Sequence, residues 1–544
     1  MEPKTNMKMI DAFILAAVVT GVCGLNMSGQ TARFQWVQHS GGTGDGMNYA
    51  ASVAVDRATN TYVTGYFQTT AVFGTNALVS EGAEDIFVAK YDRDGGLLWV
   101  RRAGGAYSDK SYGIAVDPAG NCYVTGFFKD AAHFGNITLT SSGTGPTNVP
   151  SDVFVAKYSA TGELQWAHSA GGSSDDTGYS IAADAAGACY LTGYFQGAAQ
   201  FGATTLTSVG SSDVFVAKYT TTGQLEWAQQ FGSPSQDNGR GITVDPAGNL
   251  FVTGYFADTM IVGNTNLTNA GYTDTPDVFL VKLNSQGAVQ WAQGAGGPLW
   301  DFGFGVAADN AGFCYVTGIF SGEATFNGVA VTGNGSYDCF LAKYNPNGGV
   351  EWVKTAGGAD TDVSYGVAVD GKGNSYITGY FTTNSVFGNL TLTSAGFGDV
   401  FVAKYDNAGK LIAAQRAGGT ANDYGNGIAG DNDGNCFVAG QFFGPATFGD
   451  DLTVSSADRI DAFVARWSAP DMQTPLDLTL SLCPAVRING TVGNRTYVEY
   501  ASILGGSTNW IGVTNFLLPS SPYLFLDLAA TNANRRYYRA FQTP

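Results

Sequence analysis

Short apolar runs separated by turn residues recur along most of the chain. In one unit the runs are Gly113–Val116 (GIAV), Cys122–Phe128 (CYVTGFF), Asp152–Tyr158 (DVFVAKY) and Leu164–His168, which are apolar throughout or alternate with polar residues. Clusters of Asp, Gly, Asn and Pro, such as Asp117–Asn121 (DPAGN), separate the runs. Runs of this length between such clusters are typical of β-strands joined by tight turns. Each unit therefore predicts four strands.

The unit repeats at a nearly constant period. The glycine of the string VTGYF and its variants recurs at steps of 61 to 67 residues: Gly65, Gly126, Gly193, Gly254, Gly318, Gly379 and Gly440. An aspartate opens each third strand: Asp85, Asp152, Asp213, Asp277, Asp338, Asp399 and Asp461. A tryptophan recurs in the fourth strand: Trp36, Trp99, Trp166, Trp227, Trp291 and Trp352. A four-stranded unit cannot bury both its faces alone, whereas radial packing against neighbouring units solves this. The repeat therefore predicts an all-β, seven-bladed β-propeller.

The two ends of the repeat array predict how the ring closes. Phe34–His39 (FQWVQH) matches a fourth strand that has no first three strands before it. Asp461–Trp467 (DAFVARW) matches a third strand that has no fourth strand after it. We therefore expect the N-terminal strand to complete the last blade. The long segment between second and third strands, such as 201–210, predicts a short extra hairpin.

Three recurring residues carry expectations about packing inside a blade. Glycine is unfavourable within a strand and indicates a close approach, so we expect the tryptophan to cover the glycine of the second strand. The sixth unit has Ala413 in place of this tryptophan, and we expect looser packing there or filling from elsewhere. The cation at the end of the third strand is expected to reach solvent along the blade. These cations are Lys90, Lys157, Lys218, Lys282, Lys343, Lys404 and Arg466.

Composition divides the chain into four parts. In residues 1–32, Lys4 and Lys8 precede the apolar run Ala12–Val22, which is too short to span a bilayer and is typical of a secretory signal. Residues 33–467 hold the predicted propeller. Ser468–Pro475 (SAPDMQTP) is a predicted linker. Residues 476–544 lose the period but show new strand patterns, and they predict a small C-terminal β-sandwich-like domain.

Two strings, AVDPAGNCYVTGFF (Ala115–Phe128) and DVFVAKYSATGELQWA (Asp152–Ala167), are representative of the repeat. In these strings the units resemble the SBBP repeats, a β-propeller family of bacterial proteins, and the similarity covers about residues 33–467. The resemblance implies a bacterial protein that is secreted or held at the cell surface, in a family mostly without a known biochemical activity. Residues 476–544 resemble, more loosely, the small C-terminal β-modules of secreted bacterial repeat proteins.

The charge of the chain limits the partners it can have. Only 13% of residues are charged, which excludes a coiled coil or a disordered chain, and the net charge is −18. A phosphate backbone is repelled by such a protein, so a nucleic-acid partner is disfavoured. No segment after the signal is apolar enough to cross a membrane. We expect a monomer that binds an extracellular protein or a glycan.

Six aspartates precede the first strands at a constant offset: Asp109, Asp176, Asp237, Asp301, Asp362 and Asp423. The first unit has Asn48 at the same offset. Facing a central channel, this Asp ring could bind a cation such as calcium or a basic ligand. Alternatively, each carboxylate caps the backbone of its own loop. We favour loop capping because a feature repeated in every blade more often serves the blade than a ligand. The same interpretation applies to the aspartates that open the third strands.

Residues suited to catalysis are scarce. The chain has only three histidines, His39, His133 and His168, and it has no G-x-S-x-G, H-E-x-x-H or P-loop motif. The leading hypothesis is a non-enzymatic extracytoplasmic scaffold for binding or adhesion, without a cofactor and without identified catalytic residues. The alternatives are a propeller enzyme acting on an extracellular polysaccharide or other polymer and a calcium-stabilised structural ring. A non-repeated site is expected at the most irregular loops, Ser141–Ser151 and Asn269–Pro276.

Overall fold

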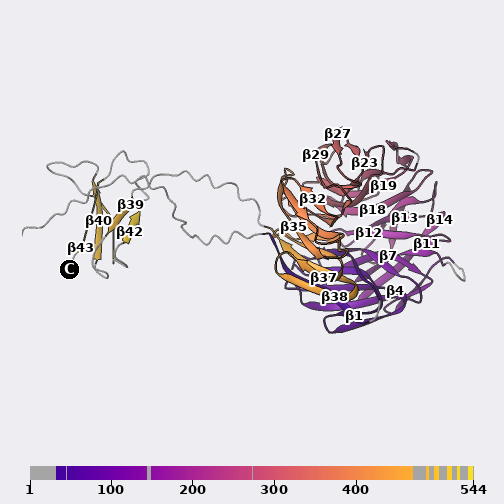
Figure 1. Cartoon of the computed structure of the whole chain (residues 1–544). Coiled ribbons are helices and arrows are strands. Elements are labelled where there is room, and N and C mark those ends of the chain that lie inside the picture. The colour runs from indigo at the N-terminus through magenta and orange to yellow at the C-terminus, as the bar shows by residue number, and fades with distance from the viewer. Residues whose placement is uncertain are drawn as a thin grey trace, which may run out of the picture. The chain divides into compact units, whose positions relative to one another are not determined.

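The computed structural model describes residues 32–43, 46–143, 149–272 and 274–469, together with five strands beyond them. The chain divides into two compact units, one holding residues 29–472 and the other the C-terminal part from Gln473 (Figure 1). All elements of regular secondary structure in the described residues are β-strands, which confirms the predicted all-β class. The signal segment, apart from Ala32, and the linker beyond Ala469 lie outside the described residues and stay predictions.

In the larger unit, sets of four strands form antiparallel sheets. The first strands are β2 (Asn48–Val55), β6 (Lys110–Val116), β12 (Thr177–Ala183), β18 (Asp237–Val244), β24 (Phe302–Ala308), β30 (Asp362–Val369) and β36 (Tyr424–Gly430). The second strands are β3 (Thr61–Phe73), β7 (Cys122–Lys129), β13 (Cys189–Phe195), β19 (Leu250–Phe256), β25 (Cys314–Phe320), β31 (Ser375–Phe381) and β37 (Asn435–Phe448). The third strands are β4 (Asn76–Tyr91), β10 (Ser151–Tyr158), β16 (Asp213–Tyr219), β22 (Asp277–Leu283), β28 (Asp338–Tyr344), β34 (Asp399–Tyr405) and β38 (Leu452–Ser468). The fourth strands are β5 (Leu97–Gly105), β11 (Leu164–Gly172), β17 (Leu225–Phe231), β23 (Val289–Gly296), β29 (Val350–Gly357), β35 (Leu411–Gly419) and β1 (Arg33–Thr43).

The first strands contact one another in a cyclic order. The series runs β2, β6, β12, β18, β24, β30 and β36, and β36 in turn contacts β2. The first strands are therefore the innermost strands of the sets, and this is the order of contacts that a closed propeller requires.

The strand β1 occupies the place of the fourth strand in the last set. It pairs antiparallel with β38, from Arg33 opposite Ser468 to His39 opposite Phe463. The chain ends had predicted this pairing, in which the first strand of the array lies beside the last.

Third strands are buried on both faces because each lies between two neighbouring sets. In β28, Cys339 and Leu341 pack with the apolar residues of the following set. Phe340 and Ala342 point to the other face and pack with those of the preceding set. Burial of a large apolar side chain contributes about 1.5–3 kcal/mol, so the cores between sets hold the larger unit together.

Short hairpins between second and third strands connect each set to the one before it. They are β8 (Ala131–Phe134) with β9 (Ile137–Thr140), β14 (Ala198–Phe201) with β15 (Thr204–Thr207), β20 (Thr259–Val262) with β21 (Thr265–Thr268), β26 (Glu323–Phe326) with β27 (Val329–Thr332), and β32 (Asn384–Phe387) with β33 (Leu390–Thr393). The strand β8 pairs with β5 of the preceding set, as Ala103 opposite Phe134 shows. In the first and last sets the long second and third strands continue directly into the hairpin.

The smaller unit contains two sheets among its described residues. Strand β39 pairs with β42, and β40 lies between β41 and β43. The bounds are β39 (Ala485–Ile488), β40 (Arg495–Ala501), β41 (Ile511–Leu517), β42 (Tyr523–Leu526) and β43 (Tyr537–Gln542).

The recurring tryptophan contacts a turn of the next set of strands, and the expectation that it covers a second-strand glycine is wrong. The Trp99 ring lies against Gly162, in the turn between the third and fourth strands of the next set. Its Nε1 donates a hydrogen bond of 3.1 Å to the Ala160 carbonyl in the same turn. Gly162 has a φ of +80°, so this turn needs glycine for its backbone as well as for the tryptophan.

The same contact explains Ala413. The set that follows Ala413 is the last one, whose fourth strand is β1, so it has no turn between third and fourth strands for a tryptophan to cover. The fully buried Trp467 of that last set packs with Ala413 and donates a 2.7 Å hydrogen bond from Nε1 to Gln415 Oε1. The space is therefore filled from a neighbouring set, one of the two outcomes expected.

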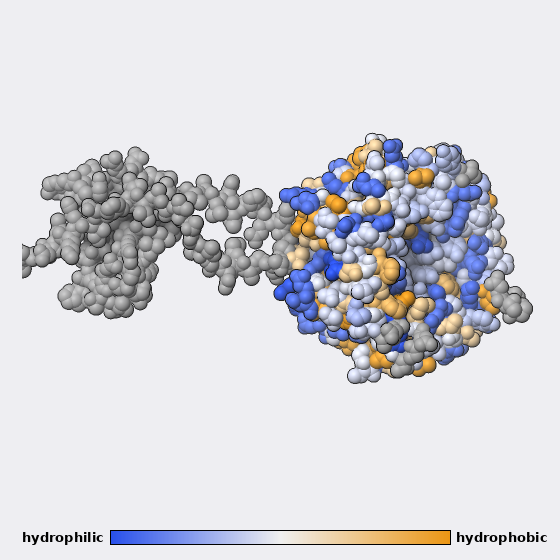
Figure 2. Space-filling view, in the orientation of Figure 1, coloured by the Kyte–Doolittle hydropathy of each residue, from blue (hydrophilic) through white to orange (hydrophobic). Residues whose placement is uncertain are grey.

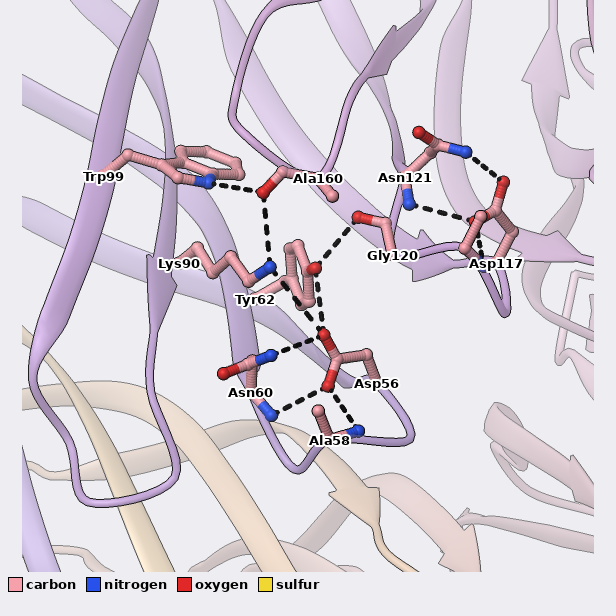
Figure 3. A network of polar contacts seen from close by, with 11 residues as sticks. Asp56, Ala58, Asn60, Tyr62, Lys90, Trp99, Asp117, Gly120, Asn121 and Ala160 are labelled. Atoms are coloured by element: carbon pink, nitrogen blue, oxygen red, sulfur yellow. Dashed lines mark hydrogen bonds and ion pairs between the residues drawn. The ribbon is translucent and has the colours of Figure 1, made fainter.

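The expectation that the third-strand lysines reach solvent is also wrong for most of them. Lys90 is only 7% exposed, its Nζ lies 4.7 Å from the centre of the Tyr62 ring, and it donates to the Ala160 carbonyl at 3.2 Å (Figure 3). The Tyr62 hydroxyl in turn donates to the Gly120 carbonyl at 2.9 Å. Asp56 accepts hydrogen bonds from its own turn and lies 3.8 Å from Lys90 Nζ. These partners compensate for the burial of the ammonium group. Because Ala160 belongs to the next set, Lys90 also links two sets. The other buried lysines are Lys157, Lys282, Lys343 and Lys404.

Candidate functional site

The Asp ring is sealed from solvent. Asp109, for example, has no exposed surface and accepts hydrogen bonds from the backbone nitrogens of Gly105 (2.7 Å) and Lys129 (3.0 Å). Corresponding backbone contacts are made by Asp176, Asp237, Asp301, Asp362 and Asp423. Asn48 instead donates to Asp461 at 3.2 Å. These contacts support the loop-capping interpretation, and ligand binding by the Asp ring stays an untested prediction.

Burial of the Asp ring has a consequence for the pH dependence of stability. Burial raises the pKa of Asp109 to about 7, although backbone hydrogen bonds oppose this, and the same cause acts on the other five carboxyls. An unfolded aspartate titrates near pH 3.9, so the folded protein binds more protons between about pH 4 and 7. Stability therefore falls as the pH rises through this window. We expect the melting temperature to be about 5 °C higher at pH 5 than at pH 8, measured by circular dichroism.

Two variants separate this effect from surface titration. Asp109→Asn should reduce the difference between the two melting temperatures, because it removes one of the buried titrating groups. Asp94→Asn should leave the difference unchanged, since the Asp94 carboxylate is 84% exposed. A melting temperature that rises from pH 5 to pH 8 would contradict the prediction.

Other recurring acidic residues also serve their own loops. Asp152, which opens a third strand, accepts hydrogen bonds from the backbone nitrogen (2.9 Å) and hydroxyl (3.0 Å) of Ser142. Asp431 accepts from the backbone nitrogens of Asp433 and Asn435 within its turn. Among the described residues, no three His, Cys, Asp or Glu side chains gather into a group that could hold a metal ion.

The second-strand glycine makes room for a β-bulge in the first strand. A Cβ at Gly126 would lie 1.9 Å from the Lys110 carbonyl oxygen, so only glycine allows the two strands to come this close. The register between the strands shifts by one residue between Ser111 and Gly113, which leaves Tyr112 unpaired in the bulge. A bulge of this kind re-aims a side chain.

Each first strand carries one such residue, and we call these residues the inner ring. The inner ring consists of Ala51, Tyr112, Tyr179, Arg240, Phe304, Tyr365 and Asn426. All seven are partly exposed, and they include five residue types. The residue in the bulge therefore varies between sets, although the second-strand glycine that makes room for the bulge recurs in all seven.

The side chains of the inner ring contact one another from strand to strand. The rings of Tyr112 and Tyr179 lie 5.3 Å apart between centres, and those of Phe304 and Tyr365 lie 5.4 Å apart. Between these pairs, Arg240 Cζ lies 3.9 Å from the centre of Tyr179 and 5.6 Å from that of Phe304. Five consecutive first strands thus contribute to one aromatic series with a guanidinium group in its middle.

Further aromatic side chains extend the inner ring toward the start of the first strands, and we call them the second tier. Its members are Tyr49, Tyr66, Tyr255, Phe302, Tyr380 and Tyr424. Tyr49 and Tyr66 are stacked with centres 4.8 Å apart, and Phe302 is parallel to Phe304 of the inner ring at 5.9 Å. Trp300 continues this series, 5.9 Å from Phe302, with 48% of its surface exposed.

Arg240 is the charged member of the inner ring at neutral pH. Burial raises the pKa values of Tyr112 and Tyr365 above their usual value, so both hydroxyls stay protonated. Another cation, Lys110, lies 4.5 Å from the centre of the second-tier Tyr66 ring and forms an ion pair of 3.4 Å with Glu84. The inner ring therefore offers aromatic faces, hydroxyl groups and one guanidinium group.

Sequence reasoning missed the inner ring and looked for a non-repeated site in two loops. Residues 144–148 of one loop and residue 273 of the other lie outside the described residues. In the second loop, Tyr272 is 75% exposed. The inner ring has a signal in the sequence, because each member lies three residues after Asn48 or a member of the Asp ring. On the face of the larger unit that Figure 2 shows, hydrophobic residues are scattered among hydrophilic ones.

Two curated proteins share sequence similarity with the chain. An uncharacterised WD repeat-containing protein of Acanthamoeba polyphaga mimivirus is 24% identical over 493 residues, which cover 73% of this chain and 35% of that protein. The regulatory protein FlaEY of Caulobacter vibrioides is 25% identical over 324 residues, which cover 56% of this chain and 32% of that protein. The chain spans about a third of the length of these relatives.

A protein of unknown function from Dyadobacter fermentans is similar in structure at 9% identity and a TM-score of 0.37, covering 66% of this chain and 94% of that chain.

Within the described part of the chain, no helix combines the length and the apolar character needed to cross a membrane.

The repeats themselves match a known family model. The match covers residues 98–126, 226–255 and 351–388, each of which runs from a fourth strand into the following unit. These three segments support the SBBP family, the β-propeller repeat, as the repeat family of this chain.

Proposed function

We propose that the chain is a non-enzymatic, extracytoplasmic binding scaffold, in which a closed seven-bladed propeller holds a ligand against the inner ring. The single observation behind this proposal is that the inner ring departs from the repeat. Residues that recur in six of the seven sets, such as Asp109, Trp99 and Lys90, are engaged in contacts that hold the fold together. The inner ring is partly exposed and contains five residue types at seven equivalent positions, as a surface selected for a ligand would.

The chemistry of the inner ring suits a glycan. Tyrosine and phenylalanine faces stack on the C–H face of a sugar, and tyrosine hydroxyls can exchange hydrogen bonds with sugar hydroxyls. The predicted signal segment in residues 1–32 would bring the protein to a compartment where glycans are plentiful. The acidic surface, with its net charge of −18, favours a monomer that stays soluble there.

A glycan array probed with the full-length protein tests the proposal, and Tyr365→Ala is the informative variant. Tyr365 contacts Phe304 and lies 6.1 Å from Tyr380, so its loss removes one face of the inner ring. We expect this variant to bind its glycan at least about tenfold more weakly. The matched control is Tyr272→Ala, because Tyr272 lies in the loop between β21 and β22, outside the first strands, and is 75% exposed.

Two results would contradict the proposal. An unchanged affinity in Tyr365→Ala would place the ligand away from the inner ring. Shorter products released from a bound glycan, detected by chromatography, would show that the protein is an enzyme.

A further inference from the structure

Arg240 lacks the partner that an arginine inside an acidic protein is expected to have. Its guanidinium group lies over the Tyr179 ring at 3.9 Å, but it forms no hydrogen bond or ion pair with a described residue. Its nitrogens are also absent from the buried polar atoms without a partner, so they reach solvent. The group is therefore held by its face while its N–H edge stays free.

The chain has enough carboxylates to pair with Arg240, yet none does so among the described residues. It contains 45 Asp and Glu residues against 27 Lys and Arg residues. The neighbouring Asp237 accepts hydrogen bonds from the backbone and hydroxyl of Ser233, and Glu84 is paired with Lys110. The acidic groups near the first strands are thus engaged elsewhere, and the guanidinium edge remains available for an anion from outside.

The single positive charge of Arg240 and the negative net charge of the protein indicate which kind of anion would bind. A planar guanidinium group binds a carboxylate through two parallel hydrogen bonds, and stacking on Tyr179 fixes its plane in advance. One cation balances one carboxylate, whereas a polyanion would be repelled by a protein of net charge −18. The rings of Tyr179 and Phe304 flank this position, and Tyr112 and Tyr365 extend the aromatic series beyond them. These aromatic faces suit an uncharged body with an apolar face.

We infer that the inner ring binds a saccharide that carries a hexuronate, with the carboxylate on Arg240 and the sugar ring against the neighbouring aromatic faces. This inference rests on the proposed binding function and names the ligand class for the same site. Arg240 would favour the carboxylate of a hexuronate over the primary hydroxyl that a neutral hexose has at the same carbon.

Matched sugar pairs test the inference with the full-length protein. The probes are the methyl glycosides of glucuronic, galacturonic and mannuronic acid and of glucose, galactose and mannose, with binding followed by NMR titration. We expect at least one acidic sugar to bind about tenfold or more tightly than its neutral partner, as a charge-assisted pair of hydrogen bonds implies. Arg240→Gln should abolish this preference, so that the acidic sugar and its neutral partner bind with similar affinities.

Three controls accompany the variant. Arg57→Gln removes an exposed cation from a turn at the other end of a first strand, and it should keep the preference. Arg240→Lys keeps the charge without the planar fork and should retain part of the preference, which tests the same point if Arg240→Gln does not fold. A short peptide with a free C-terminal carboxylate tests whether the ligand is a saccharide at all.

Each outcome decides between the inference and the function on which it rests. Acidic and neutral sugars that bind equally well, with no effect of Arg240→Gln, would overturn the hexuronate and leave a neutral glycan scaffold. Binding of the peptide alone would overturn the saccharide and leave a carboxylate site. Binding of no sugar and no peptide, together with an empty glycan array, would overturn both the inference and the proposed function.

Discussion

Deleting β1 is expected to lower the melting temperature of the protein by about 10 °C or more. The strand fills the fourth place in the last sheet, so its loss exposes the edge of β38 along the pairing from Arg33 to His39. It also removes Phe34, which is 6% exposed and lies edge-on to Phe448 at 5.3 Å. The third lost contact is the hydrogen bond from Trp36 Nε1 to the Arg93 carbonyl of the first set. Circular dichroism melts of the full-length and shortened chains measure the difference.

Two neighbouring positions in β1 provide a matched pair of variants for the same prediction. Phe34→Asp places a charge in the apolar core, and we expect a loss of about 4 kcal/mol or more in the free energy of unfolding. Gln35→Asp adds the same charge on the exposed face of the strand and should cost less than about 1 kcal/mol. A shortened chain that melts within about 2 °C of the full-length protein would show that the pairing of β1 does not stabilise the larger unit.

Replacing Trp166 by alanine should lower the free energy of unfolding by about 3–5 kcal/mol. The side chain is 8% exposed and lies against Gly223 of the next set. Its Nε1 donates a hydrogen bond of 3.1 Å to the Thr221 carbonyl, which would keep only the 3.3 Å hydrogen bond from Lys157 Nζ. The variant removes a contact between two sets, so chemical denaturation should show a lower midpoint for the whole larger unit.

The control for this loss is Trp300→Ala. Trp300 is half-exposed and contacts Phe302 in the second tier, so its removal leaves no cavity between sets. We expect it to change the free energy of unfolding by less than about 1 kcal/mol. Similar losses in the two variants would contradict the view that the recurring tryptophan acts as a contact between sets.

The positions of the strands could be predicted from the sequence because local patterns determine them. The turn residues Asp117–Asn121 end one strand and begin another, and Cys122–Phe128 continues as β7. The repeat array begins with a lone fourth-strand pattern, Phe34–His39, and ends with a third-strand pattern that no fourth follows, Asp461–Trp467. The pairing of β1 with β38 joins these two ends. The contacts of the recurring tryptophan and lysine could not be predicted, since both involve the next unit about 60 residues further along the chain.

The sequence by itself determined the all-β class, the repeat and the pairing of its two ends, because strand length, turn residues and period are local properties of the chain. Only the tertiary structure decided which residues form the inner ring. The bulge between Ser111 and Gly113 shifts the two-residue alternation of the strand, so a pattern of apolar and polar residues does not show where Tyr112 points. The placement of Arg240 between Tyr179 and Phe304 joins three separate sets, and packing around a common centre brings them together.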